Sequence, residues 1–451
     1  MEQSSGTSYG RKVLYSMGSL SAAVAGQVVA TWLLYFYVDY IKLPVALYSL
    51  GMIIYSVWNA VNDPLAGYVS DRTRSRWGRR VPYIAFLSLP LAVSLTLVWT
   101  PPAGVSGWGL FGYFVAILFV FDTLFTFVIL NWTALFPEMY PSLRERSQVS
   151  ALRQFLAILG MVLAMALPPV LYTALGWPVM GAILGAVTGI GLYLSLLGSR
   201  ERPEVHTGEP LNLLPALKAT FVNRSFVTMV LTSLFAQFAF VVLPAAIPLY
   251  AKYVLGIADQ QMTLIFLAVF GSAIVMFFVW QRVTTAIGPR QAFRYGLVLF
   301  AAGLIPFLFL KDLTMTLVTA VFLGVGLAPL MMIIDILISD VIDEDQVRTG
   351  TRREGMYFGV HGFVIRFNIA LQGLIFGALL TWGGYVADAA QTEKAVLAIR
   401  MLMTVVPWAA LALSFVTVTL YPLHGRRLEE MKEALVKVQA QAKTKSEAAA
   451  D

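Results

Sequence analysis

The side chains best suited to chemistry lie in one apolar segment around residue 60. Asn59 and Asp63 are four residues apart and share one face of a helix, with Asn62 adjoining them. Pro64 has no N–H, so a helix through this segment leaves the carbonyl of Ala60 as a further acceptor. A carboxylate among neutral oxygens suits a hard monovalent cation or a proton. The alternative is an aspartate that a neighbouring helix or a loop arginine holds in place.

Asp122 provides a second acidic group, in another apolar segment. Its helical face continues through Thr126, Ile129 and Thr133. At a rise of about 1.5 Å per residue, Asp122 and Asn59 come at about the same depth, so the two segments can share one site. A buried aspartate that bonds to a neighbouring helix explains Asp122 equally well. The residues predicted to bind a cation are Asp63, Asn59, Asn62 and Asp122.

Arginines inside apolar segments provide the opposite charge. They are Arg153, Arg366 and, nearer the end of its segment, Arg400. A guanidinium offers five fixed N–H donors that suit hydroxyl, carboxylate or phosphate oxygens of a solute. The alternative is an ion pair inside the protein, with Asp63 or Asp122 as the natural partner. Both can hold at different steps of a cycle.

Neutral polar side chains form stripes on two further segments. One stripe recurs every four residues around Thr31, and another includes His361, from which Arg366 points roughly 140° away. Together with two of the arginines and an aromatic platform, they can hydrogen-bond a polar solute. The residues predicted to contact a solute are Arg153, Arg366, Gln27, Thr31, Tyr35, Trp132, His361, Asn368 and Gln372.

The elements that position these residues are membrane spans. Of the 451 residues, 58% are hydrophobic and 13% are charged, whereas a soluble domain has roughly 25% charged residues. A span needs about 20 mostly apolar residues. About twelve such stretches can be marked off, at approximately 13–37, 44–69, 82–100, 109–136, 149–174, 178–198, 226–250, 262–281, 292–310, 313–338, 356–382 and 396–421.

Composition also excludes several classes of protein. Cys is absent, and the three His are too scattered for a local metal motif, so thiol chemistry and metalloenzymes are not expected. No enzyme motif and no cofactor site is predicted. The net charge of +7 comes from short basic runs between apolar stretches, which indicates a lipid bilayer and not nucleic acid as the partner. The run 13–37 is too long for a signal peptide and predicts a first span.

The Lys and Arg distribution predicts how the spans are oriented. Positive residues are retained on the cytoplasmic side. With the N-terminus inside, the other side keeps only Lys42, Lys252, Lys311 and Lys394. We therefore expect an all-α membrane protein with both termini cytoplasmic and twelve helices in two six-helix halves. The predicted parts are the halves 1–198 and 226–421, a cytoplasmic linker 199–225 and a tail 422–451.

Charged residues in the predicted cytoplasmic loops form a candidate gate. Acidic and basic groups cluster at 71–80 and again at 340–353, where charge networks would hold the inside closed. Basic runs that only determine topology are the alternative. The candidate gate residues are Asp71, Arg72, Asp340, Asp343, Arg352 and Arg353, with Glu344 and Arg348 beside them.

Three sequence segments resemble the glycoside-pentoside-hexuronide:cation symporters of the major facilitator superfamily, the family of the melibiose permease. They are WNAVNDP at 58–64 running into SDRTRSRWGRR at 70–80, ER at 145–146 followed by Arg153, and DVID at 340–343 leading to TGTRREG at 349–355. The resemblance implies repeated helical halves that rock around a central site. It implies that Asp63 is the cation-site carboxylate and that Arg153 contacts the substrate. Arg366 stands where the family usually has a Lys.

Some positions depart from the pattern that the resemblance implies. Asn59, Ile129 and Ala23 stand where acidic residues are expected, which favours H⁺, or a weakly bound Na⁺, as the coupling ion. The resemblance implies symport of a sugar or glycoside by a monomer in a bacterial inner membrane. Vertebrate lysolipid transporters share the Asp-Pro motif, so an amphiphile is the alternative. A receptor or assembly factor is less favoured, because it has no need of charges inside the membrane.

Overall fold

The computed structural model describes residues 8–140, 143–201, 220–350 and 353–448. Within these ranges the regular structure is entirely helical, and twelve helices are long and apolar enough to cross a membrane. The predicted all-α fold with twelve spans is confirmed. Most of the predicted linker and one candidate gate residue, Arg352, lie outside the described residues.

The first six spans begin and end close to their predicted limits. They are α1 (Tyr9–Leu34) with the π-helix η1 (Tyr35–Tyr40), α2 (Val45–Arg72), α3 (Val81–Val98), α4 (Gly107–Met139), α5 (Leu143–Ala166) with the short α6 (Pro168–Leu175), and α7 (Trp177–Gly198).

The remaining spans are more often built from two consecutive helices. They are α9 (Arg224–Tyr250) with the π-helix η2 (Ala251–Leu255), α10 (Asp259–Ile287), α11 (Pro289–Leu304) with η3 (Ile305–Leu308), α12 (Leu313–Thr349), α13 (Glu354–Ile365) with α14 (Phe367–Gly383), and α15 (Glu393–Met403) with α16 (Val405–Thr419). A further helix, α17 (Arg426–Ala448), ends the described chain.

The predicted fifth span, 149–174, is broken by two consecutive prolines. Pro168 and Pro169 have no N–H, so α5 ends at Ala166 and its last carbonyls need other donors. The indole N–H of Trp32 donates to the carbonyl of Ala164 at 3.2 Å. The hydroxyl of Thr263 donates to the carbonyl of Ala166 at 2.6 Å. Neighbouring helices thus provide hydrogen-bond donors to carbonyl groups that would be costly to leave unpaired in an apolar environment.

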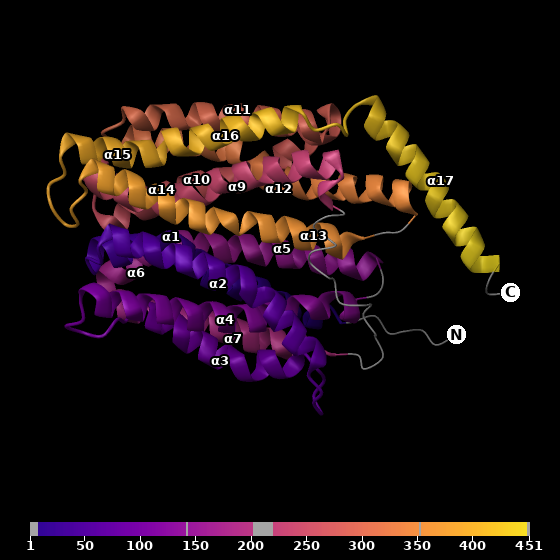
Figure 1. Cartoon of the computed structure of the whole chain (residues 1–451), viewed down its shortest axis with the longest axis horizontal. Coiled ribbons are helices and arrows are strands. Elements are labelled where there is room, and N and C mark those ends of the chain that lie inside the picture. The colour runs from indigo at the N-terminus through magenta and orange to yellow at the C-terminus, as the bar shows by residue number, and fades with distance from the viewer. Residues whose placement is uncertain (1–7, 141–142, 202–219, 351–352, 449–451) are drawn as a thin grey trace. The chain divides into compact units, whose positions relative to one another are not determined.

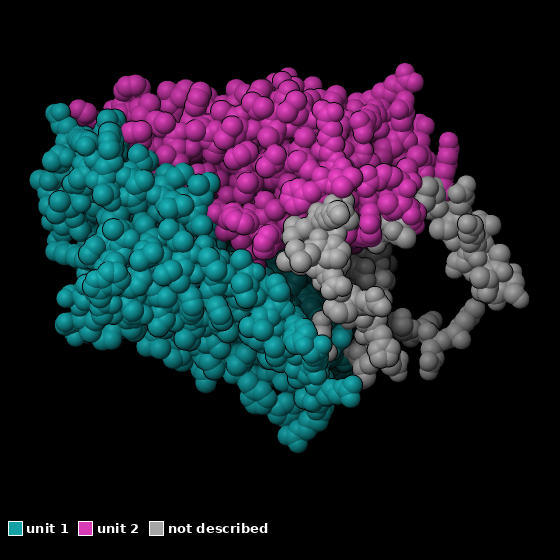
Figure 2. All heavy atoms as spheres, in the orientation of Figure 1, with its two compact units in different colours: residues 1–208, 244–266, 369–399 teal, residues 209–243, 267–368, 400–451 magenta. Residues whose placement is uncertain are grey.

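The contacts within the chain divide it into two compact units (Figure 2). Unit 1 contains residues 1–208, 244–266 and 369–399, and unit 2 contains residues 209–243, 267–368 and 400–451. Unit 1 thus adds the ends of later spans to the first six helices. The predicted division into halves 1–198 and 226–421 stays a prediction.

Small residues allow close packing inside each unit. In unit 1, α1 lies against α5 and α7, and α3 lies against α4 and α7 (Figure 1). A Cβ on Gly185 of α7 would come 2.6 Å from the carbonyl oxygen of Ala92 on α3, so this helix pair requires glycine there. In unit 2, α12 packs against α11 and α17. A Cβ on Gly326 would come 2.3 Å from the backbone nitrogen of Phe300.

Candidate transport site

The helix α2 presents three hydrogen-bond donors to the carboxylate of Asp122 on α4. The amide of Asn59 donates to Oδ1 at 2.7 Å and the amide of Asn62 to Oδ2 at 2.9 Å. The hydroxyl of Tyr55 donates to Oδ1 at 3.1 Å. Asp122 is 3% exposed, so these neutral donors replace water around a buried carboxylate. The role of this group as a cation ligand stays a prediction.

Asp63 lies one helical turn beyond Asn59 on the same helix pair. It is half-buried, and the hydroxyl of Thr126 on α4 donates to its Oδ1 at 3.1 Å. The side-chain oxygen of Asn62 is buried and accepts no hydrogen bond from the described residues. Carboxylate and amide oxygens from two helices therefore lie within neighbouring turns, and oxygen ligands are what hard cations prefer.

Arg153 on α5 rests on aromatic rings. Its guanidinium carbon lies 4.5 Å from the ring centroid of Trp132 and 4.8 Å from that of Phe136. Among the described residues it forms no ion pair with a carboxylate, so the predicted alternative of a bond to Asp63 or Asp122 is not found there. Its Nε is buried and has no acceptor in the described part of the chain. The cation is held by ring faces, which leaves its donors available to a solute.

Trp132 is in turn fixed by Tyr15 on α1. The Tyr15 hydroxyl donates to the Trp132 carbonyl at 2.8 Å, and the indole N–H donates to the Tyr15 carbonyl at 3.2 Å. The two rings stack with centroids 5.2 Å apart. A Cβ on Gly18 would come 2.3 Å from the indole, so only glycine admits it. Trp132 is 2% exposed and supports Arg153 here, instead of offering an open platform to a solute.

The polar stripe on the first span is less accessible than expected. Thr31 is fully buried, and its hydroxyl has no partner among the described residues. The Tyr35 hydroxyl donates to both carboxylate oxygens of Asp259 at 3.2 Å. Gln27 is half-buried. In this conformation the Tyr35 hydroxyl is therefore used in the bond to Asp259 at the start of α10. Gln27 keeps some exposed surface.

The second polar stripe lies on α13 and α14. His361 Nε2 lies 2.7 Å from the hydroxyl of Ser233 on α9, and the Asn368 amide donates to a carbonyl of the same helix at 3.1 Å. Gln372 is buried. Arg366 stands at the break between α13 and α14, where the predicted continuous helix is interrupted.

The candidate gate residues at 340–353 lie next to acidic and basic partners within unit 2. Asp345 is completely buried and pairs with Arg353 at 2.6 Å and with Arg348 at 3.2 Å. This hydrogen bonding raises the pKa of Arg353. Two acidic residues of α12 contact α17. Asp340 lies 3.9 Å from Lys432, and Glu344 pairs with Arg427 at 3.1 Å. Asp345 was not among the predicted residues, although it lies between two of them.

The arginines of the other predicted gate segment, 71–80, contact residues of unit 1. Arg72 lies over the ring of Tyr68, with 3.7 Å between its guanidinium carbon and the ring centroid. Glu138 on α4 pairs with Arg79 at 2.8 Å and with Arg80 at 3.1 Å. The side chain of Asp71 lies outside the described residues.

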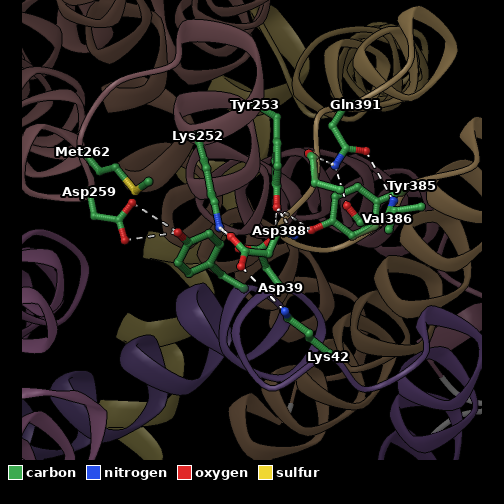
Figure 3. Close-up of polar contacts among 12 residues, drawn as sticks. Asp39, Lys42, Lys252, Tyr253, Asp259, Met262, Tyr385, Val386, Asp388 and Gln391 are labelled. Atoms are coloured by element: carbon green, nitrogen blue, oxygen red, sulfur yellow. Dashed lines mark hydrogen bonds and ion pairs between the residues drawn. The ribbon is translucent and has the colours of Figure 1, made fainter.

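A polar cluster that the sequence analysis did not predict surrounds Asp39 (Figure 3). We call it the Asp39 cluster, and it consists of Asp39, Lys42, Lys252, Tyr253, Tyr385 and Asp388. Sequence reasoning used its lysines only to predict orientation. A signal was present, because Asp39 ends the first span and Lys252 ends the seventh, and the ends of odd-numbered spans share one membrane face.

Twelve helices that are long and apolar enough to cross a membrane, with charged groups inside them, fit a membrane transporter, and comparison with known proteins gives the family. Residues 14–425 match the family described as MFS/sugar transport protein. The chain therefore belongs to this family, as its sequence motifs predicted, and is a multi-pass protein of the cell membrane.

Individual relatives are distant but match almost end to end. The chain is 26% identical to an isoprimeverose transporter of Lactiplantibacillus pentosus, over 90% of this chain and 87% of that protein. It is 25% identical to a putative glycoside/cation symporter of Escherichia coli, over 95% of both. It is 24% identical to the sodium-dependent lysophosphatidylcholine symporter 1 of Gallus gallus, over 97% and 90%.

Solved structures agree on the fold. A D-xylose-proton symporter superposes with a TM-score of 0.65 at 14% identity, covering 90% of this chain and 97% of that one. A bacterial homolog of the human lysosomal transporter Spinster gives a TM-score of 0.66 at 12% identity, covering 91% and 96%. At such identities the likeness concerns the fold alone.

Proposed function

We propose that this protein is a secondary active transporter that couples the movement of a sugar or glycoside to H⁺ or Na⁺ by alternating access. The observation that carries the proposal is that unit 1 contains two kinds of charged group inside its spans. Asp122 is a buried carboxylate that α2 encloses beside Asp63, and Arg153 is a cation without a carboxylate partner among the described residues. The first suits a coupling ion, and the second suits a polar solute.

The coupling ion binds between α2 and α4 in this proposal. Asp63 and Asp122 supply carboxylate oxygens, and rotation of the Asn59 and Asn62 amides turns their oxygens toward the same space. A proton needs one of these carboxylates, whereas Na⁺ needs several of the oxygens at once. Binding to either carboxylate lowers the net negative charge between the helices, which favours a change in their packing.

The solute binds to Arg153 and the polar stripes. Arg366, Gln27, Thr31, His361, Asn368 and Gln372 supply further hydrogen bonds, and Trp132 and Tyr35 position or flank them. The isoprimeverose transporter and the glycoside/cation symporter among the relatives support a glycoside. No cofactor is involved, and the transporter acts as a monomer with both termini in the cytoplasm.

A lysolipid is the second candidate substrate. The lysophosphatidylcholine symporter among the relatives favours it, and a guanidinium on ring faces binds a phosphate as well as it binds hydroxyls. The amides of the two stripes argue for the sugar. Buried amides left unpaired beside an acyl chain would cost about 1 to 3 kcal/mol each.

The test is uptake into proteoliposomes that carry a pH gradient, a Na⁺ gradient or neither. We expect a labelled neutral or uronic glycoside to accumulate only with a gradient, and single-chain phospholipids not to compete. Asp63→Asn should abolish accumulation while leaving exchange of solute across the membrane. The matched control is Asp312→Asn, which changes a surface aspartate that caps α12 and keeps its capping ability.

Two outcomes would contradict parts of the proposal. If Asp63→Asn still concentrates the solute normally, the ion site lies elsewhere, and Asp122→Asn is the next variant to measure. Saturable, gradient-dependent uptake of a lysophospholipid, with no response to any glycoside, would replace the sugar by the amphiphile.

A further inference from the structure

Asp39 is the centre of a polar cluster that joins three distant parts of the chain. Its carboxylate is 1% exposed and accepts a hydrogen bond from the ammonium of Lys252 at 2.6 Å. The hydroxyls of Tyr253 and Tyr385 also donate to it. The three donors come from η2 and from the segment after α14, while Asp39 belongs to η1 (Figure 3). A buried carboxylate with one cationic and two hydroxyl donors is strongly held.

A second, exposed carboxylate lies beside the first. Asp388 lies 3.4 Å from the ammonium of Lys252 and 3.6 Å from that of Lys42. The charge of Lys252 lowers the pKa of Asp388, and Lys42 adds to the effect, so Asp388 is ionised at neutral pH. Lys252 therefore has two carboxylates within reach, one buried and one exposed.

Several residues of the Asp39 cluster have an unusual backbone conformation. Lys42 and Asp388 have φ angles of 65° and 56°, in the left-handed region that residues other than glycine seldom adopt. Asp39 lies in the π-helix η1, and Lys252 and Tyr253 lie in the π-helix η2. Helix geometry of this kind and left-handed residues are concentrated at functional and moving parts of proteins.

Other contacts in unit 1 join the same segments. The Tyr35 hydroxyl donates to Asp259 at the start of α10, and Thr263 donates to the carbonyl of Ala166 at the end of α5. Gln260 donates to the hydroxyl of Thr173 on α6 at 3.2 Å. The segment 244–266 is thereby bonded to the ends of spans 1 and 5, beside the Asp39 cluster.

We propose that the Asp39 cluster is a latch that holds this end of the helices closed, and that it opens when Lys252 leaves Asp39. This inference rests on the proposed transport by alternating access. The orientation predicted from Lys and Arg places the latch at the outer face, so its opening would admit solute from outside. Asp388 gives Lys252 a solvated partner during opening, which avoids the cost of an unpaired ammonium.

The test measures a distance across the latch and needs no substrate. The chain has no Cys, so Ser106→Cys and Ala390→Cys, at two exposed positions on the parts that the latch joins, can carry spin labels. We expect a single distance in the parent chain and a second, longer distance in Asp39→Asn. The ratio of open to closed molecules should rise about tenfold or more, because a charge-assisted bond to a buried group is lost.

The matched control is Asp312→Asn, an exposed aspartate outside the Asp39 cluster, which should leave the distances unchanged. Lys252→Arg keeps the charge and should retain most of the closed population. If Asp39→Asn does not fold, Tyr253→Phe and Tyr385→Phe each remove one hydroxyl and should show a smaller shift in the same direction.

An unchanged distance distribution in a folded Asp39→Asn protein, or in both tyrosine variants, would overturn the latch. The outcome is separate from that of the proposed function. If the distances respond in a protein that carries no solute under any gradient, the latch stands and the transport proposal fails.

Discussion

At the scale of single residues, the cations and carboxylates inside spans have unequal surroundings. Asp122 is enclosed by neutral donors, whereas Arg153 lies on rings. Sequence reasoning predicted both as functional candidates, because charges inside spans are costly and can be counted directly. It missed Tyr15 and its bond to Trp132, because the two residues are 117 positions apart and an aromatic residue in a span is ordinary.

Tyr15→Phe tests whether Tyr15 fixes the support of Arg153. The variant keeps the ring stack but loses the hydroxyl bond to the Trp132 carbonyl, which is buried. We expect a loss of about 1 kcal/mol in the free energy of unfolding, measured by denaturation in detergent micelles.

The control for this prediction is Tyr193→Phe. The Tyr193 hydroxyl donates to the Ala85 carbonyl at 3.3 Å at an exposed position, so its loss should cost less. Equal losses in the two variants would mean that the Tyr15 bond contributes nothing beyond an ordinary surface hydroxyl.

At the scale of elements, hydrophobic length was sufficient to predict where the spans lie. It did not predict the breaks at Ala166, Arg366 and Thr404, and the first of these depends on neighbouring helices that bond the freed carbonyls. Prolines were the visible signal, because Pro168 and Pro169 follow the first break and Pro407 follows the break at Thr404. The sequence also did not predict that the tail contacts the bundle. Basic residues of α17 pair with acidic residues of α12 in the candidate gate.

Docking of α17 on α12 should depend on pH through His424, which precedes α17. His424 is exposed, but the part of its side chain that is removed from water lowers its pKa, and the nearby charges of Arg290 and Arg427 lower it further. A histidine with a lowered pKa binds its proton more weakly in the docked state. Its contribution is therefore complete above the ordinary value of about 6.5 and is lost as the pH falls through the lowered pKa.

The measurement is the mobility of a spin label at Val436, an exposed position on α17. Mobility should rise between pH 7 and pH 5 in the parent chain, and His424→Gln should remove that part of the pH dependence. A pH profile that is the same in both proteins would assign the effect to other groups and not to His424.

At the scale of the whole molecule, the family match and the twelve spans agree with what composition and motifs predicted. The Asp39 cluster was not predicted, because it needs three segments that are more than 130 residues apart in sequence. Such a cluster has no local motif. The orientation of the molecule stays a prediction, and the side on which the latch and the candidate gate act depends on it.

Impermeant labelling of single cysteines in intact cells tests that orientation. Ser106→Cys lies in the turn before α4, which the Lys and Arg distribution assigns to the outside, and Val436→Cys lies on α17, which it assigns to the cytoplasm. Both positions are exposed in the structure, so a difference in labelling reports the side of the membrane and not burial. We expect a charged maleimide to label the first in intact cells and the second only after the membrane is permeabilised. The reversed labelling pattern would mean that the predicted orientation is wrong. The Asp39 cluster would then lie at the cytoplasmic side, and the charged residues at 340–353 would lie at the outer side.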